Sequence, residues 1–86
     1  MAKKKVPVPL REHTSDKELE LIGDRIKSLR RARGFTSAEK FANTYEISRI
    51  QWGKYERGYN MNTATLIKIC KVFEITLPEF FAEGFD

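Results

Sequence analysis

Apolar residues recur along this chain every three or four positions, the spacing that places side chains on one face of an α-helix. The pattern occurs in five separate stretches. Residues that can cap a helix precede several of them, and glycine follows two. We therefore expect an all-α fold without strands, with helices near residues 16–33, 37–45, 48–57, 63–73 and 77–82.

The first of these helices shows the signals most completely. Ser15 and Glu18 have the spacing of a capping box, arginines fill the last turn, and Gly34 suits the end of the helix. The stripe expected to face the core consists of Leu19, Ile22, Ile26 and Leu29.

The helix predicted at residues 48–57 has two chemically different sides. One stripe is aromatic and consists of Trp52, Tyr55 and Tyr59. The other is mainly basic and consists of Arg49, Ile50, Gly53, Lys54 and Arg57. Ser48 can cap its start, and Gly58 suits the left-handed residue after its end. Such a helix fits a groove lined with phosphates, although a basic face that simply meets solvent is equally common in amphipathic helices.

The segment before this helix favours the DNA-binding interpretation. Its apolar stripe consists of Ala38, Phe41, Ala42 and Tyr45. Only a few residues separate Tyr45 from Ser48, and two short helices across such a tight connection form a helix-turn-helix.

Together these residues resemble the phage-repressor/Cro-type, or XRE-like, helix-turn-helix family over roughly residues 19–81. The matching motifs are Leu29-Arg30, Phe41-Ala42, Ile47-Ser48, Tyr55-Glu56-Arg57-Gly58, Leu66-Ile67-Lys68-Ile69 and Leu77-Pro78-Glu79-Phe80-Phe81. The resemblance implies a five-helix repressor-like bundle in which Arg30 and Glu56 form a structural ion pair. Two departures are Ala38, where the family often has a phosphate-binding glutamine, and Glu46, where it usually has a turn glycine.

In helix-turn-helix proteins the N-terminal end of the second helix meets base edges, whereas residues near its other end meet the backbone. The residues expected to face bases are Ser48, Arg49, Ile50, Gln51 and Lys54. The residues expected to contact phosphates are Arg57, Ser37, Lys3, Lys4 and Lys5. Gly53 weakens a helix, which makes sense if a DNA wall approaches too closely for a side chain.

Length and charge agree with this assignment. The 86 residues allow one small domain, which we divide into a flexible basic arm at 1–14 and a helix-turn-helix DNA-binding domain at 15–86. The net charge is +4, and residues 25–57 contain nine Lys or Arg against three Glu. This concentration is the footprint expected of a nucleic-acid surface. The lysines of the arm fit phosphates or a minor groove, and a solvated tail explains them equally well.

Catalysis finds no support in the sequence. His13, the one histidine, falls in the arm, and no catalytic triad, carboxylate pair or glycine-rich phosphate loop can be assembled. Cys70 lies among core positions and is expected to be an inert thiol. We expect no enzyme activity, metal or cofactor, no signal peptide and no membrane span, and a cytoplasmic location.

The C-terminal third contains more apolar surface than short helices easily cover. The helix at 63–73, which Asn62 can cap, is apolar over more than half its circumference and is expected to be the buried central helix. Phe80, Phe81 and Phe85 follow, and they either close the core or form a dimer interface.

The sequence thus predicts a sequence-specific regulator of transcription that binds double-stranded DNA as a repressor-like homodimer, with helices 48–57 of the two copies about 34 Å apart. The alternative is a protein-interaction module, antitoxin-like or polymerase-contacting, with the phenylalanine-rich C-terminus as its binding patch. RNA binding is less favoured because the aromatic residues fall on core stripes.

Overall fold

The computed structural model describes residues 6–86 and contains five α-helices, with no strand among these residues. The elements are the 3-10 helix η1 (Leu10–Glu12), α1 (Asp16–Ala32), α2 (Ala38–Thr44), α3 (Arg49–Glu56), α4 (Thr63–Val72) and α5 (Leu77–Phe81). The expected all-α class is confirmed, and no predicted helix extends more than one residue beyond the observed one at either end. The short η1 was not expected. No helix in the described part of the chain is long and apolar enough to cross a bilayer.

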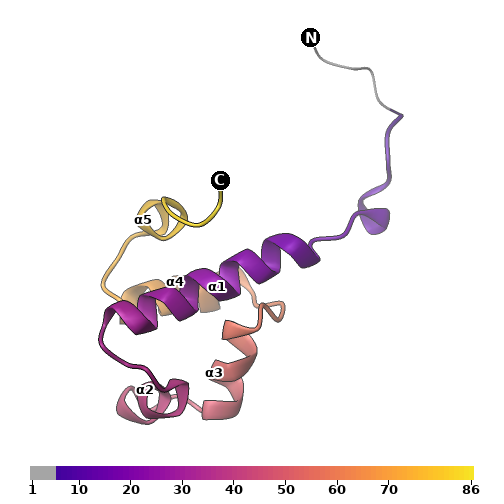
Figure 1. Ribbon diagram of the computed structural model, residues 1–86. Helices are drawn as coiled ribbons and strands as arrows, with labels where there is room; N and C mark the ends of the chain where they lie inside the picture. Colours follow the sequence, from indigo (N-terminus) through magenta and orange to yellow (C-terminus); the bar gives the residue numbers. More distant parts are fainter. Residues whose placement is uncertain (1–5) are drawn as a thin grey trace.

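The helices are arranged around α1, the longest of them (Figure 1). In this view α2 and α3 lie below α1, α4 passes behind it, and α5 with the C-terminus lies above it. The segment that contains η1 runs away from the helices to the upper right. The two sides of α1 therefore carry different parts of the molecule.

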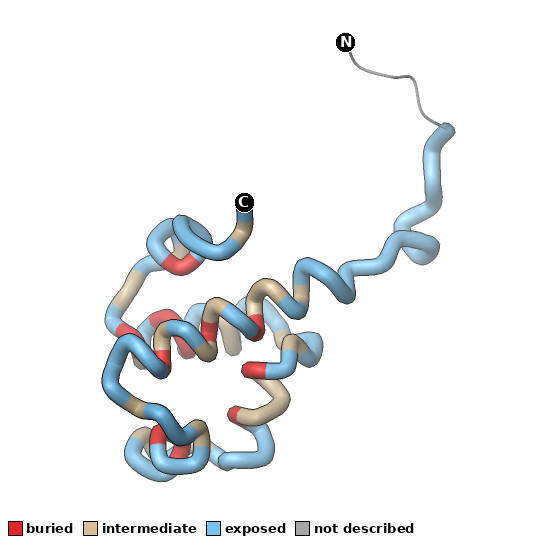
Figure 2. The backbone as a smooth tube through the Cα atoms, in the orientation of Figure 1, coloured by how far each residue is buried: buried red, intermediate tan, exposed pale blue. Residues whose placement is uncertain are grey.

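All five α-helices contribute buried side chains to the core, and the buried positions of Figure 2 follow these elements. Phe41 is its centre, since its ring lies 4.8 Å from that of Trp52 and 5.3 Å from that of Phe73. The largest fully buried side chains are those of Trp52, Phe41, Phe80 and Ile26. The expected burial of α4 is found in part. Ile69 and Cys70 are buried, whereas Ile67 remains 36% exposed.

Four of the five α-helices start with a side-chain cap. The capping residues are Ser37, Ser48, Asn62 and Thr76. Thr76 forms a capping box with Glu79. The box expected at Ser15 is absent, because ψ of Ser15 is 15° instead of the extended value near that of Thr76, 166°. Its hydroxyl consequently accepts no bond from the first turn of α1.

The first four α-helices end in the same way, with a residue in the left-handed conformation followed by an apolar one. The left-handed residues are Gly34, Glu46, Gly58 and Glu74, with φ of 88°, 56°, 81° and 58°. In each case the next residue donates its N–H to the carbonyl five positions back, as Ile47 does to Ala42 at 2.8 Å. These are Schellman motifs, which satisfy carbonyls that the helix leaves unpaired.

Arg25 of α1 and Arg33, the residue directly after α1, complete the ends of α5 and α4. Arg25 donates to the carbonyl oxygens of Phe80 at 2.7 Å and Glu79 at 3.0 Å. Arg33 donates to the carbonyl oxygen of Phe73 at 2.7 Å. A guanidinium group near a helix C-terminus also meets the negative end of the helix dipole, so α1 holds the C-terminal elements by charge as well as by packing.

Candidate nucleic-acid interface

The inward side of α3 is fixed by a buried aromatic residue and a buried carboxylate. Trp52 is almost fully buried, and its indole N–H donates to Oε2 of Glu56 at 2.6 Å. The two residues are one helical turn apart, so the bond lies along the inner surface of α3. Because an unpaired buried carboxylate is costly, this bond and those from α1 hold α3 in one orientation.

Arg30 of α1 supplies the charge that Glu56 needs. Its Nε lies 2.7 Å from Oε2 of Glu56 and its Nη2 lies 3.1 Å from Oε1, which makes the pair bidentate. The remaining Nη1 donates to the carbonyl oxygen of Phe35 at 2.8 Å. The ion pair expected from the sequence is present, and it is buried on both sides. Sequence reasoning did not identify the bond from Trp52.

A close backbone contact joins the same two helices. A Cβ atom on Gly23 would lie 2.6 Å from the backbone nitrogen of Gly58 and 2.7 Å from the carbonyl oxygen of Glu56. A Cβ on Gly58 would lie 2.6 Å from the carbonyl oxygen of Leu19. Only glycine permits this approach. Gly23 was not identified from the sequence, although a glycine inside a predicted helix is a signal of close packing.

The outward side of α3 presents the residues expected to face bases. Ser48, Arg49, Ile50 and Gln51 are all exposed, and Ser48 accepts a bond from the backbone N–H of Gln51 at 3.3 Å. Ile50 is 68% exposed and contributes little to the fold. Lys54 is half-buried, so it is less accessible than the other four.

Arg49 is not entirely free on this surface. Its Nη1 lies 3.5 Å from Oε2 of Glu39 on α2, and both side chains are exposed. Exposed pairs of this kind contribute under about 1 kcal/mol, so a stronger acceptor can replace the carboxylate. Glu39 therefore belongs to the candidate interface, although no sequence signal pointed to it.

The expected phosphate contacts have different local settings. Arg57 is exposed, and its guanidinium carbon lies 5.2 Å from the centre of the Tyr59 ring. Tyr59 itself is exposed and lies beyond the end of α3, so its assignment to the buried stripe was wrong. Ser37 is exposed at the start of α2, where its oxygen accepts from the N–H of Lys40. Lys3, Lys4 and Lys5 lie outside the described residues.

Not all of the positive charge of residues 25–57 is available to a ligand. Arg25, Arg30 and Arg33 make the internal bonds given above. Their hydrogen bonds to carbonyls and carboxylates use donors that a phosphate would otherwise accept from. The other basic residues of this stretch are Lys27, Arg31, Lys40, Arg49, Lys54 and Arg57. Among them Arg49 has only the exposed contact with Glu39.

The described residues contain no group of side chains arranged to hold a metal ion. Cys70 is buried in the core. Burial raises the pKa of the Cys70 thiol above its ordinary value, and the charge of Arg25 offsets only part of that rise. The thiol consequently lacks the thiolate character of a reactive cysteine.

Comparison with known proteins adds no relative: no family model matches the sequence, and no curated protein or solved structure matches it either. The assignment below therefore depends on the geometry of α2 and α3 and on the residues they expose.

Proposed function

We propose that this protein is a sequence-specific transcription regulator that binds double-stranded DNA and reads the major groove with α3. The observation that carries the proposal is the asymmetry of α3. Trp52 and Glu56 fix one side of the helix within the fold, while Arg49 and Ile50 project from the other side into solvent. A rigidly held helix with an exposed base-reading set is what groove recognition requires.

The connection between α2 and α3 supports a helix-turn-helix of the repressor type. Only residues 45–48 separate the two helices. Glu46 adopts the left-handed conformation, with φ of 56°, at the position where the resembling family usually has glycine. Side chains are tolerated in this region at some cost, so the departure in sequence is compatible with the turn of the family.

Each exposed residue of α3 has a contact suited to its chemistry. Arg49 can donate two hydrogen bonds to one guanine, Gln51 can pair with adenine, and Ile50 can cover a thymine methyl group. Ser48 and Lys54 flank this set. Arg57 and Ser37 lie at the margins, where contacts to phosphates set the register.

Gly53 fits the same assignment. A Cβ atom at this position would meet only the flexible end of the Arg57 side chain, at 3.2 Å. The fold therefore does not require glycine here, unlike at Gly23. Close approach of a DNA backbone or base edge explains why a residue unfavourable to helices stands in the middle of α3.

The regulator is proposed to act as a homodimer on a two-fold site. Two copies of α3 about 34 Å apart would enter successive major grooves on one face of the duplex. A domain of this size has a modest core, and Phe81 remains 43% exposed after folding. Pairing of two copies would cover such surface.

The decisive experiment is repeated selection of bound duplexes from a random library, followed by affinity measurements across a salt series. A recurring two-fold sequence, bound far more tightly than scrambled duplex, supports the proposal. Equal affinity for both duplexes, changing with salt alone, would show that only phosphates are contacted and would overturn sequence-specific reading.

One observation favours a protein-interaction module as the second candidate. Phe81 and Phe85 have ring centres 4.9 Å apart beside the buried Phe80, and together they leave aromatic surface exposed. If selection returns no sequence, capture of a defined protein that is lost on Phe81→Ser would favour this function.

A further inference from the structure

The described part of the N-terminal arm carries apolar side chains that its own chain does not cover. Val6, Val8 and Leu10 are 84%, 49% and 89% exposed. Pro7 and Pro9 alternate with them, and Pro9 has the extended backbone of φ −57° and ψ 147°. Proline restricts the backbone, so the arm loses little conformational entropy when a partner binds it. An extended, alternating apolar segment of this kind suits a groove.

The course of the arm leads it away from the surface of its own domain. Nε2 of His13 lies 3.0 Å from the carbonyl oxygen of Val8, which closes the turn around η1. From there the chain runs away from α5 and the C-terminal segment (Figure 1). The apolar side chains are thus presented outwards, toward another molecule.

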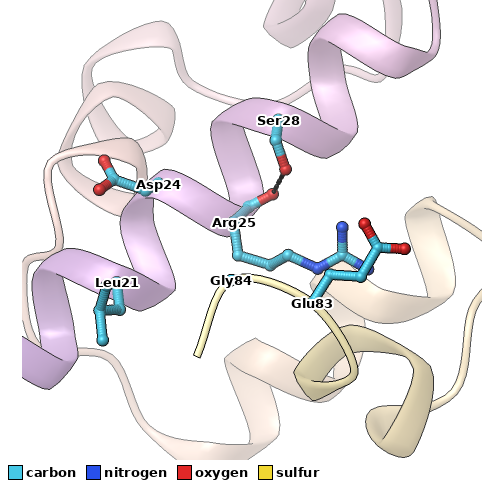
Figure 3. Close-up of a pocket in the computed structure, with 6 residues that line it drawn as sticks. All are labelled: Leu21, Asp24, Arg25, Ser28, Glu83 and Gly84. Atoms are coloured by element: carbon cyan, nitrogen blue, oxygen red, sulfur yellow. Dashed lines mark hydrogen bonds between the residues drawn. The ribbon is translucent and has the colours of Figure 1, made fainter. Parts of the chain in front are cut away.

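A hollow of about 350 Å³ lies between α1 and the C-terminal segment of the chain. It is lined by Leu21, Asp24, Arg25, Ser28, Glu83 and Gly84, and Figure 3 shows the tail at Gly84 passing beside Arg25. Leu21 is the one apolar side chain among these six residues, and carbon atoms make up much of the exposed lining surface. The guanidinium of Arg25 is already bonded to backbone carbonyls of α5, whereas Asp24 and Glu83 form no ion pair within residues 6–86.

This hollow faces away from α3. Leu21, Arg25 and Ser28 are spaced three and four residues apart and share one face of α1. Gly23 and Arg30, which contact the end of α3, are on the opposite face. A partner in the hollow would therefore leave the exposed side of α3 accessible.

Opposite net charges indicate that the N-terminal arm is the segment that binds in the hollow. Residues 1–14 hold four basic residues and one acidic residue, a net charge of +3. The hollow lies between two acidic segments: residues 15–24 have a net charge of −3, and residues 72–86 contain four acidic and no basic residues. Opposite charges on two surfaces speed their encounter in solution and disfavour partners that carry the wrong charge.

We propose that this hollow docks the N-terminal arm of a second copy of the chain, so that two copies exchange arms. Val8 and Leu10 enter the hollow, and Arg11 meets the carboxylates of Asp24 and Glu83 at its rim. This proposal can be tested separately from the proposed DNA binding, because self-association is measured in the absence of DNA.

The first test is sedimentation of the full chain over a concentration series. Val8→Ser with Leu10→Ser, the arm variant, is expected to weaken association by at least about tenfold. Asp24→Lys with Glu83→Lys, the hollow variant, is expected to weaken it similarly by charge repulsion. Ile67→Ser is the control, since it removes an exposed apolar side chain from α4, outside the arm and the hollow, and should leave association unchanged. Unaltered helicity and unfolding midpoint show that each variant folds.

Mixing the two defective variants identifies exchange between chains. The arm variant keeps its hollow and the hollow variant keeps its arm, so a mixture regains one of the two contacts and associates more tightly than either alone. A second mixture, of Leu10→Cys and Ser28→Cys chains, is expected to form a disulfide between different chains, while buried Cys70 does not react.

Three results would overturn the proposal. The unaltered chain could stay monomeric at every concentration. It could associate with the same affinity whether or not the arm and the hollow are altered, which would place the interface elsewhere. The arm variant and an Arg11→Glu variant could lose affinity only for DNA, with self-association intact, which would make the arm a phosphate-binding element.

Discussion

Two ion pairs join α3 to its neighbours, and they differ in almost every respect except charge. The Arg30–Glu56 pair has side chains 5% and 6% exposed, and Trp52 supplies a further bond to it. The Arg49–Glu39 pair has side chains 66% and 59% exposed and a single contact of 3.5 Å. The first pair holds the helix in place, whereas the second leaves an arginine ready to exchange its partner. Positive charge in a sequence therefore indicates a nucleic-acid surface only after the structural arginines are set aside.

The largest expected effect concerns the buried pair. Glu56→Ala leaves the Arg30 guanidinium buried without its counter-charge and frees the Trp52 N–H, so the free energy of unfolding should fall by about 3–5 kcal/mol. Urea unfolding measures this. Arg30→Met combined with Glu56→Leu should recover much of the loss, because neither charge then remains unpaired. A small loss for Glu56→Ala would mean that solvent reaches the pair.

The next effect concerns the backbone contact behind α3. Gly23→Ala places a methyl group 2.6 Å from the backbone nitrogen of Gly58, so the helices must separate, and stability should fall by about 1–3 kcal/mol. Gly34→Ala is an informative comparison, because a Cβ there meets nothing within 4 Å and only the positive φ of 88° opposes it. Thermal unfolding distinguishes the two. Unchanged stability in Gly23→Ala would contradict the close approach of α1 and α3.

On the exposed side, the expected effect is on binding. Arg49→Ala should lose about 1–3 kcal/mol on the cognate duplex and relax the preference at one base pair. Arg57→Ala is the matched control, since loss of a phosphate contact should weaken all duplexes alike and flatten the salt dependence. Titrations on cognate and scrambled duplexes separate the two. Equal losses on both duplexes for Arg49→Ala would show that α3 does not read bases.

Gly53→Ala should affect the two properties in opposite directions. The free energy of unfolding should rise by about 1 kcal/mol, because alanine favours the helix and the new methyl group meets only a movable arginine side chain. Affinity for the cognate duplex should fall, since the methyl group occupies space proposed for DNA. Parallel unfolding and binding measurements test this, and undiminished affinity would remove the functional explanation for this glycine.

The smallest effect is expected for the exposed pair. Glu39→Gln removes the contact to Arg49 and should change the free energy of unfolding by under about 1 kcal/mol. The same substitution at a buried carboxylate, Glu56→Gln, provides the contrast. A large loss at Glu39 would mean that this pair also stabilises the fold, and the distinction between the two ends of α3 would fail.

The positions of the helices could be predicted because their signals are local. Apolar periodicity and the capping residues Ser48, Asn62 and Thr76 lie within a few residues of the structure they determine. The Arg30–Glu56 pair came from family resemblance, since no local pattern joins residues so far apart in sequence. Periodicity also placed Arg49, Ile50 and Arg57 on the exposed side of α3, but it did not predict that Lys54 is half-buried.

Other features could not be predicted because they depend on tertiary contacts. Nothing near Arg25 or Arg33 reveals that their partners lie 55 and 40 residues further along. The exposure of Ile67 depends on how the other helices pack around α4, and the sequence of α4 alone does not contain this information. Glu46 and Glu74 occupy left-handed positions that local propensity assigns to glycine or asparagine.

The bonds from α1 also bear on how the protein folds during synthesis. The ribosome makes α1 first, but the partners of Arg30, Arg33 and Arg25 follow only at Glu56, Phe73 and Phe80. These contacts join segments distant in sequence, and their loop-closure entropy opposes early formation. Until these segments have been synthesised, water hydrates the guanidinium groups of the nascent chain. We therefore expect the bonds that join the first α-helix to the last to form late, once the carbonyl groups of α5 are available to Arg25.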